Sequence, residues 1–215
     1  MHDADEPDDT AMFTREFWDE RYAGSDRVWS GRPNPRLVEH ASVLTPGTAI
    51  DVGCGEGADV VWLAEHGWQA TGVDVSGVAL DRARQHAMEA GVDERTTWQQ
   101  ADLVAGDPLP GTADLVSVQY LHLPSSVFAD AYAEILAAAR PGGTLIVVGH
   151  HPDDARTGLR NERLTHLLFP PEAVTALLDD AWDISVAASP TREVEADGRR
   201  VTVTDTVIVA NRAMP

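Results

Sequence analysis

The sequence has no lysine and only one cysteine, Cys54, and aromatic residues make up 6% of its 215 residues. All 16 basic residues are arginines, against 35 acidic residues, which gives a formal net charge of −19 at pH 7. A chain so short of basic residues has little to follow the phosphates of a nucleic acid, and we expect no nucleic-acid partner. A single cysteine forms neither an intrachain disulfide nor a Cys-x-x-Cys metal site, which suits a reducing, cytoplasmic location.

Long apolar runs are also missing. No stretch approaches the roughly 18 apolar residues that a membrane-spanning helix needs, so we expect no membrane association. The first ten residues have neither the basic nor the apolar region of a secretory signal, and residues 1–11 are predicted to be a disordered acidic tail. The remaining length fits one domain over residues 12–215, with a helical cap over 12–47 and a core over 48–215, as a monomer or homodimer.

The most informative stretch is a glycine-rich turn. A short apolar run over residues 49–52 ends in three alternating glycines, Gly53, Gly55 and Gly57, which lead directly into an apolar pattern of helical spacing. This pattern predicts a strand, a tight turn and a helix. Glycines in such a turn allow positive φ and close approach of a ligand, and the first N–H groups of the helix face that ligand. Cys54, inside the turn, is interpreted as a small buried filler rather than a nucleophile.

Two classes of ligand use such a turn. Gly53, Gly55 and Ala58, with Asp74 roughly 20 residues further on, match a dinucleotide fingerprint and would indicate an NAD(P)-dependent oxidoreductase. Asp51 argues against this reading. A carboxylate two residues before the first glycine would repel a pyrophosphate, whereas it can help to hold a cationic amino group.

The pattern Asp-x-Gly-x-Gly-x-Gly at residues 51–57 resembles motif I of the class I S-adenosylmethionine-dependent methyltransferases. The resemblance implies that the glycine loop lies against the methionine part of S-adenosylmethionine, that Asp74 binds the ribose, and that Asp102 marks the adenine side. The product would be S-adenosylhomocysteine. The cofactor-binding residues that this resemblance implies are Trp29, Arg32, Asp51, Gly53, Gly55, Gly57, Asp74, Val75, Asp102, Leu103 and Gln119.

Strand and helix patterns alternate through the middle of the chain, which implies parallel strands joined by right-handed crossovers. Further strands are expected over residues 68–74, 96–101, 113–119 and 144–149, with helices from Ser76 to Ala90 and over 126–140. A short helix is expected from Pro170 to Ala181. Two extended segments, 182–195 and 199–210, then flank the hairpin signal Asp197-Gly198.

These elements predict an α/β fold with helices on both faces of a Rossmann-like, doubly wound sheet. The sheet is expected to be seven-stranded and mostly parallel, with an antiparallel C-terminal hairpin strand. A reversed last strand is what the methyltransferase resemblance implies, and a plain dinucleotide-binding fold does not require it.

The N-terminal region, with a helix expected over residues 13–22 and a loop over 23–34, resembles the cap of the tellurite-resistance, thiopurine and thiol methyltransferase branch. The resemblance implies a cap that closes over the cofactor, with Trp29 on the methionine or sulfonium and Arg32 paired with the carboxylate. The alternative is that Trp29 only packs the cap on the sheet. Because the loop has few local hydrogen-bond partners, we expect a lid that is mobile without ligand.

The acceptor site is expected at the carboxyl ends of the strands, where open α/β sheets bind their ligands. Tyr120 and His122 follow the fourth strand, and His150 and His151 follow the fifth; all four are candidate substrate contacts, and Tyr120 and His122 are the catalytic candidates. An imidazole pKa near 6.5 suits a general base, and the alternative for His122 is a pocket-lining hydrogen-bonding residue. The two adjacent histidines point to opposite sides, and we expect no metal site.

Together these patterns predict methyl transfer from S-adenosylmethionine to a small-molecule acceptor, with a sulfur-type acceptor slightly favoured. Two alternatives remain at this point. One is the NAD(P)-dependent oxidoreductase, and the other is a catalytically inactive S-adenosylmethionine-binding protein.

Overall fold

The computed structural model describes residues 12–160, 162–196 and 198–214. The acidic tail expected over residues 1–11 lies outside the described residues. No helix in the described part of the chain is long and apolar enough to cross a membrane.

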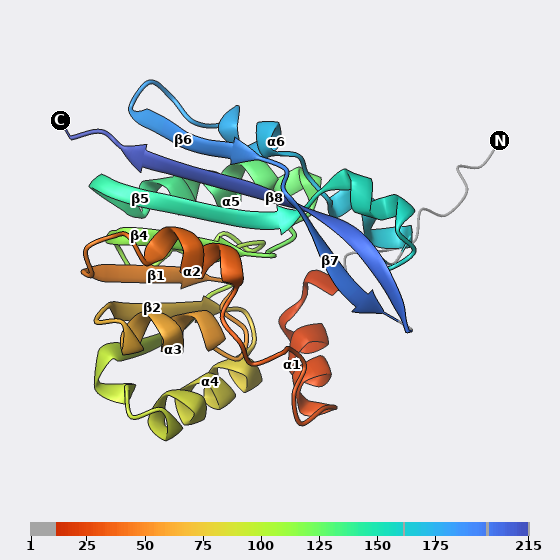
Figure 1. The fold of residues 1–215 in the computed structure, drawn as a ribbon. Helices are drawn as coiled ribbons and strands as arrows, with labels where there is room; N and C mark the ends of the chain where they lie inside the picture. The colour runs from red at the N-terminus through yellow and green to blue at the C-terminus, as the bar shows by residue number, and fades with distance from the viewer. Residues whose placement is uncertain (1–11, 161, 197, 215) are drawn as a thin grey trace.

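A mixed sheet of eight strands forms the centre of the fold (Figure 1). Its main path has the order β3-β2-β1-β4-β5-β8-β6, and β7 pairs with β8 beside that path. Strands β1 to β5 are parallel, and β8 runs antiparallel to β5, β6 and β7, which confirms the doubly wound, mostly parallel fold with a reversed last strand. The strands are β1 (Thr48–Val52), β2 (Gln69–Asp74), β3 (Thr96–Gln100), β4 (Ala113–Gln119), β5 (Ala139–His150), β6 (Trp182–Ala188), β7 (Thr191–Ala196) and β8 (Arg199–Arg212).

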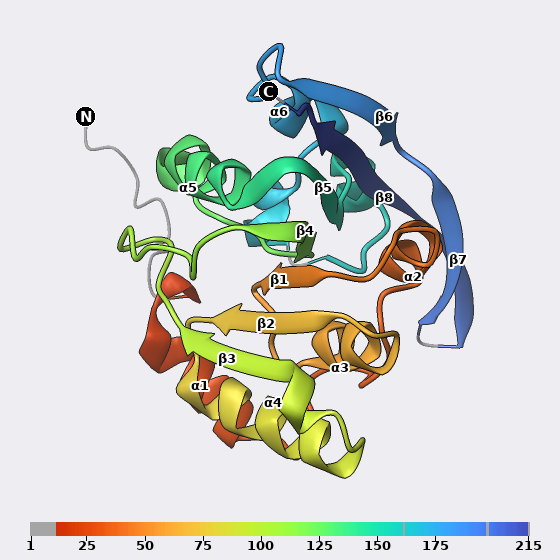
Figure 2. The same cartoon turned by 90° about the vertical axis from the view of Figure 1, so that its left-hand side faces the viewer.

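Helices cover both faces of this sheet (Figure 2). The α-helices are α1 (Arg15–Ala23), α2 (Pro35–Ala41), α3 (Ala58–Glu65), α4 (Gly77–Glu89), α5 (Ser125–Ala137) and α6 (Pro171–Thr175). Short 3₁₀ helices are η2 (Asp93–Arg95), η3 (Pro152–Arg156) and η4 (Glu162–Leu167). As expected, Ser76 caps α4, accepting a hydrogen bond from the backbone N–H of Ala79.

The two faces of the sheet bury separate apolar cores, because side chains alternate along each strand. Ile50 and Val52 of β1 pack in the core that α5 and α6 cover, whereas Ala49 packs in the core under α2 and α3. The alternation therefore places Asp51 on the α2 and α3 side, near the carboxyl end of its strand.

Strand β5 begins earlier than residue 144, where the sequence pattern placed its start. Ala139 already pairs with Ala113 of β4, and the irregular stretch Pro141-Gly142-Gly143 lies inside the strand, where the register with β4 shifts. Gly143 fits because a Cβ there would lie 3.0 Å from the carbonyl oxygen of Ala113. The preceding helix, α5, correspondingly ends at Ala137 rather than at Arg140.

The C-terminal region also differs in detail from the prediction. The segment 182–195 is not one strand, because Ser189 and Pro190 interrupt it between β6 and β7. Proline has no N–H for a sheet ladder, and here its carbonyl instead accepts a hydrogen bond from the N–H of Asp205. The helix expected to run to Ala181 ends at Thr175. Strands β7 and β8 form a hairpin that projects beyond the carboxyl end of β5 (Figure 1).

Candidate active site

The glycine loop between β1 and α3 adopts a conformation that favours glycine at three positions. Gly53, Gly55 and Gly57 have φ angles of 74°, 52° and 81°. Close packing adds a second restriction, since a Cβ on Gly53 would lie 3.1 Å from the side chain of Leu121 and one on Gly57 would lie 2.6 Å from that of Trp98. Backbone conformation and close packing therefore both favour glycine in this loop.

Cys54 fills space inside this loop. Its sulfur packs so near Gly72 that a Cβ on that glycine would lie 2.8 Å away. Burial, with the charge of Asp74 as a second cause, raises the pKa of the thiol. A thiol that stays protonated is a poor nucleophile, which agrees with its interpretation as a filler.

Asp74, at the end of β2, holds the loop in place. One carboxylate oxygen accepts the N–H of Gly55 at 2.8 Å, and the other accepts the N–H of Ser76 at 2.9 Å. Burial raises the pKa of Asp74, while these N–H bonds oppose the shift. Each carboxylate oxygen has a further lone pair, so the group retains the capacity to accept bonds from two hydroxyls.

Asp51 belongs to a polar chain that runs from the core to the cap. Ser117 donates to its carboxylate at 2.6 Å, Gln119 donates to the Ser117 hydroxyl at 3.1 Å, and Asn34 donates to the Gln119 side chain at 2.8 Å. Asp59 accepts the N–H of Asn34, also at 2.6 Å. Burial raises the pKa of Asp59 to about 6, and burial together with the charge of Asp59 raises that of Asp51. Two carboxyl groups of this kind, one buried and one half-buried, attract a ligand cation.

On the expected adenine side, Asp102 first shapes its own loop. One carboxylate oxygen accepts the N–H groups of Val104 and Ala105 at 2.9 and 3.1 Å. The other oxygen has no hydrogen-bond partner among the residues described. Leu103 packs against the core on the α5 side, and the carbonyl of Val75 accepts a bond from Gln100 at 2.9 Å.

Two aromatic side chains of the cap cover the glycine loop. A Cβ on Gly55 would lie 2.9 Å from the hydroxyl of Tyr22 and 3.2 Å from the indole nitrogen of Trp29. That nitrogen donates to the Tyr22 hydroxyl at 2.8 Å, and the Arg21 guanidinium lies 5.5 Å from the Trp29 ring centroid. Trp29 is 48% exposed and so is not a core residue. Arg32 is exposed too, and its guanidinium has no partner within the described part of the chain.

The cap loop is fastened to the core more firmly than we expected. The buried carboxylate of Glu56 accepts the N–H groups of Val28 and Trp29 at 3.2 and 3.1 Å. Arg82 pairs with Glu56 at 3.0 Å and donates to the carbonyls of Tyr22 and Ser25. These hydrogen-bond partners are not local, because they come from 26 to 60 residues away in the sequence.

On the expected acceptor side, three rings form a stack at the carboxyl ends of β4 and β5. The ring centroids of Tyr120 and His150 are 4.3 Å apart, and those of His122 and His150 are 5.1 Å apart. Tyr120 has a φ of 55°, the one positive value for a non-glycine residue in the described part of the chain. A residue of this size in the left-handed region marks a turn that the surroundings hold in place.

Both stacked histidines are neutral at pH 7. Burial lowers the pKa of His122 to about 4, and the charge of Arg160 adds to the shift. Burial and Arg160 also lower the pKa of His150, whose Nδ1 lies 2.9 Å from an Nη of that arginine. The Nε2 atom of His122 is buried without a hydrogen-bond partner among the described residues. A pKa this low favours the pocket-lining interpretation of His122 over the general base.

His151 does not join this stack. Its Nδ1 accepts the N–H of Asp153 and lies 3.3 Å from the Asp153 carboxylate, at the start of η3. The structure therefore brings together Tyr120, His122 and His150 and separates His151 from them, as expected for adjacent residues at a strand end.

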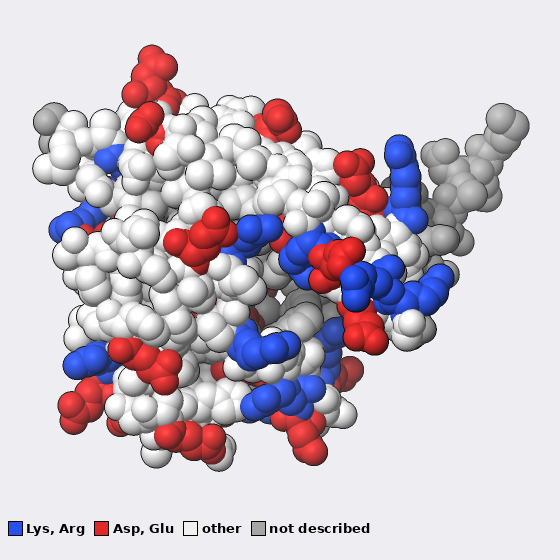
Figure 3. All heavy atoms as spheres, viewed as in Figure 1, with Lys and Arg blue, Asp and Glu red and all other residues white. Residues whose placement is uncertain are grey.

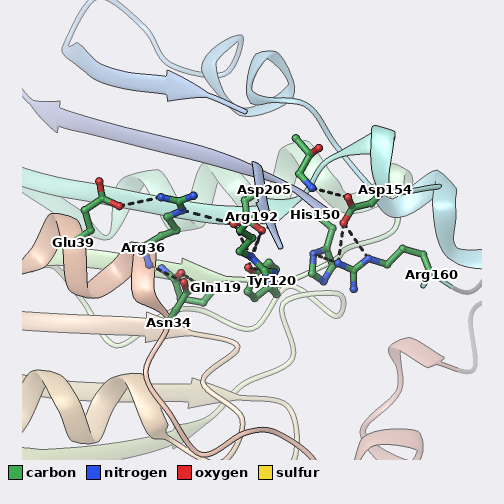
Figure 4. A network of polar contacts seen from close by, with 11 residues as sticks. Asn34, Arg36, Glu39, Gln119, Tyr120, His150, Asp154, Arg160, Arg192 and Asp205 are labelled. Atoms are coloured by element: carbon green, nitrogen blue, oxygen red, sulfur yellow. Dashed lines mark hydrogen bonds and ion pairs between the residues drawn. The ribbon is translucent and has the colours of Figure 1, made fainter. Parts of the chain in front are cut away.

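Two arginine–carboxylate pairs surround the stack and were missed by sequence reasoning (Figure 4). Arg192 of β7 pairs with Asp205 of β8 at 3.0 Å, and the Tyr120 hydroxyl donates to the same carboxylate. Arg160 pairs with Asp154 of η3 at 2.8 Å. The one available signal was a carboxylate, Asp205, inside the apolar pattern of a strand, since buried charges need partners.

Comparison with known proteins agrees with this geometry. A family model described as a methyltransferase domain matches residues 49–143. The chain is 34% identical over 123 residues to the ribosomal RNA small subunit methyltransferase C of Alcanivorax borkumensis, covering 54% of this chain and 36% of that protein. It is 32% identical over 126 residues to the 2-heptyl-1-hydroxyquinolin-4(1H)-one methyltransferase of Mycobacteroides abscessus, covering 56% and 54%. Residues 49–143 therefore form a methyltransferase domain, and these matches support a class I S-adenosylmethionine-dependent methyltransferase.

The methyltransferase-domain match favours S-adenosylmethionine over a dinucleotide as the ligand of the glycine turn. The chain spans only 36% and 54% of the lengths of these two relatives. The fold is also similar to TehB from Haemophilus influenzae, with a TM-score of 0.70 and 14% identity over 92% of this chain and 66% of TehB. This likeness is one of fold.

Proposed function

We propose that this methyltransferase transfers the methyl group of S-adenosylmethionine to a small molecule bound between the glycine loop and the ring stack. The observation that carries the proposal is that both features lie at the same edge of one sheet. The loop follows β1, Asp74 ends β2, Tyr120 follows β4 and His150 ends β5. Because these strands are parallel, their carboxyl ends meet along this edge.

The residues along β1 and β2 fit the two polar ends of the cofactor. The remaining lone pairs of Asp74 suit the two ribose hydroxyls, and the raised pKa values of Asp51 and Asp59 suit a nearby ammonium group. Trp29, whose indole nitrogen lies near Gly55, is proposed to cover the methionine part. The further cofactor contacts we propose are Arg32, Gly53, Gly57, Val75, Asp102, Leu103 and Gln119. S-adenosylmethionine supplies an activated methyl group, so the chain mainly has to align the acceptor.

A small acceptor suits this chain better than a nucleic acid. The two relatives carry names that refer to ribosomal RNA and to a hydroxyquinolone, so the family does not fix the acceptor. A net charge of −19 disfavours a surface that follows phosphates.

We further propose that the methylated atom is sulfur. With a pKa of about 4, His122 removes a proton poorly at pH 7, so the acceptor must ionise largely without it. The charges of Arg160 and Arg192, which act on His150, favour an anionic acceptor beside the stack. A thiol, with a pKa of about 8.5, needs a smaller shift to become anionic at pH 7 than a phenol of about 10.

Two measurements test this function. Calorimetry should show binding of S-adenosylmethionine and S-adenosylhomocysteine but not of NAD. Transfer of a radiolabelled methyl group should then be faster to aromatic thiols than to phenols of the same skeleton. A chain that binds S-adenosylhomocysteine but methylates neither series would be the catalytically inactive binding protein, and binding of NAD alone would overturn the proposal.

A further inference from the structure

The surroundings of the ring stack point to a particular kind of acceptor. We infer that the acceptor carries a carboxylate, and that Arg160 and Arg192 bind it beside Tyr120 and His150. This inference rests on the proposed function, because it concerns the molecule that accepts the methyl group.

The two arginines reach the stack from different parts of the chain. Arg192, from β7, donates through Nη2 to the Tyr120 hydroxyl at 3.2 Å. Arg160, between η3 and η4, lies 2.9 Å through Nη2 from Nδ1 of His150. Since the Tyr120 and His150 rings stack directly on one another, the two guanidinium groups flank one aromatic surface (Figure 4).

Each guanidinium is held in a fixed orientation by a buried carboxylate. Nε of Arg192 contacts both oxygens of Asp205 at 3.1 and 3.0 Å, and Arg160 contacts one oxygen of Asp154 through Nε and Nη2 at 3.3 and 2.8 Å. The side chains of both aspartates are 1% exposed. Arginines fixed in this way lose little side-chain entropy when they bind a ligand.

Both arginines keep hydrogen-bond donors that the protein does not use. A guanidinium has five N–H groups, and the hydrogen bonds of each arginine to the described residues involve only Nε and Nη2. The Nη1 group of each has no partner among the described residues, and the side chains of Arg192 and Arg160 are 37% and 23% exposed. Spare N–H groups on a positive, partly exposed fork match the oxygens of a carboxylate.

The rings add no charge of their own to the stack side, because the lowered pKa values of His122 and His150 keep both imidazoles neutral at pH 7. Asp154 and Asp205, which pair with the two arginines, are buried. Figure 3 shows a hollow on this face of the molecule, with arginine side chains gathered around it among a few acidic ones. In a chain of net charge −19, such a grouping of arginines at the acceptor side is most simply explained by an anionic ligand.

Matched ligand pairs test this inference on the protein loaded with S-adenosylhomocysteine. The probes are thiosalicylate and 3-mercaptopropionate, each compared with its neutral methyl ester, with affinity measured by calorimetry. At least one acid should bind tenfold or more tightly than its ester. Arg192→Gln and Arg160→Gln should each reduce that preference several-fold and leave the affinity for the ester nearly unchanged. Arg200→Gln, an exposed arginine of the same β7–β8 hairpin, should leave the preference unchanged.

A double variant and a folding control complete the test. Because Arg192→Gln leaves Asp205 buried without its main partner, the double variant Arg192→Gln/Asp205→Asn should show the same loss of acid preference in a folded protein. Normal binding of S-adenosylhomocysteine shows that a variant is folded and keeps the proposed function separate from this inference. The inference is overturned if neither acid binds more tightly than its ester, or if neither binds at all. It is also overturned if the arginine variants lower acid and ester affinity equally. In each case the methyltransferase function stands.

Discussion

The hydroxyl of Tyr120 donates a hydrogen bond of 3.0 Å to a carboxylate oxygen of Asp205, which lies 85 residues further along the chain. This contact joins the turn after β4 to the middle of β8. Asp205 also pairs with Arg192 and, at 3.6 Å, with Arg36 of α2. Burial, with the charge of Asp205 as the next cause, raises the pKa of Tyr120 to about 12, so the phenol remains a donor at neutral pH. Through Asp205, the reversed strand β8 thus holds Tyr120 in place at the carboxyl end of β4.

Replacing Asp74 by alanine should weaken S-adenosylhomocysteine binding. The carboxylate is proposed to accept bonds from the ribose, and a hydrogen bond to a charged group contributes roughly 1.5 to 3 kcal/mol, which is about 10- to 150-fold in affinity. Asp81→Ala, an exposed residue of α4, is the matched control and should bind normally. Unchanged calorimetric affinity in the Asp74 variant would remove this residue from the site.

Asp59 should make folding stability depend on pH in an unusual direction. Its folded pKa of about 6 lies above the unfolded value of about 3.9, so the folded protein binds the proton more tightly. Stability from this group is therefore greatest below about pH 4 and falls as pH rises to about 6. Asp59→Asn keeps the acceptor for Asn34 but cannot ionise, so wild type should lose on the order of 1 to 3 kcal/mol relative to it across this window.

Denaturant unfolding of wild type and Asp59→Asn at several pH values between 4 and 7 checks this prediction. Asp81→Asn provides the control for an exposed carboxylate. Stability curves of wild type and Asp59→Asn that stay parallel over the window would show that Asp59 is not protonated there. Added S-adenosylmethionine should reduce the difference, because its ammonium group favours the ionised carboxylates.

His122→Gln should retain catalysis to within about tenfold in kcat, since a positioned general base contributes more, typically 10²- to 10⁴-fold. With a pKa of about 4, His122 should also add no inflection to the pH–rate profile between pH 5.5 and 8. The profile of wild type and variant with the best thiol acceptor is the measurement. A loss above a hundredfold, together with an inflection near pH 6.5 that the variant lacks, would identify His122 as the base.

The backbone amides of the cap loop should be protected from hydrogen exchange partly by Glu56 and further by the bound ligand. The amides of Val28 and Trp29 donate to Glu56, so hydrogen exchange should already be slow there without ligand, and Glu56→Gln should speed it. Bound S-adenosylhomocysteine should then raise protection across residues 23–34. Equal protection with and without the ligand would make the cap purely structural.

A substitution in the cap gives a separate check on its role. Trp29→Ala should lower cofactor affinity more than it lowers the melting temperature of the ligand-free protein, because the ring covers Gly55 and is about half exposed. Calorimetry and thermal unfolding of the same variant measure the two effects. The reverse order of effects would assign Trp29 to the packing of the cap on the sheet.

Local sequence was sufficient wherever the physical cause was local. The three glycines of the loop, the serine cap of α4 and the period of the strands depend on backbone conformation and on neighbours a few residues away. The order of Asp51, Asp74 and Asp102 at successive strand ends followed from the same pattern. These features were enough to predict the fold, and the resemblance of residues 51–57 to motif I added the class of cofactor.

Tertiary structure alone determined which side chains meet on the expected acceptor side. Arg160 and Arg192 reach the ring stack across 10 and 72 residues of sequence, and Glu56 fastens a loop 28 residues away. Side-chain pairs of this kind leave no periodic trace, because only the folded sheet brings their partners together. The same holds for the pKa of His122, since burial, which no sequence pattern measures, makes this candidate base a weakly basic ring.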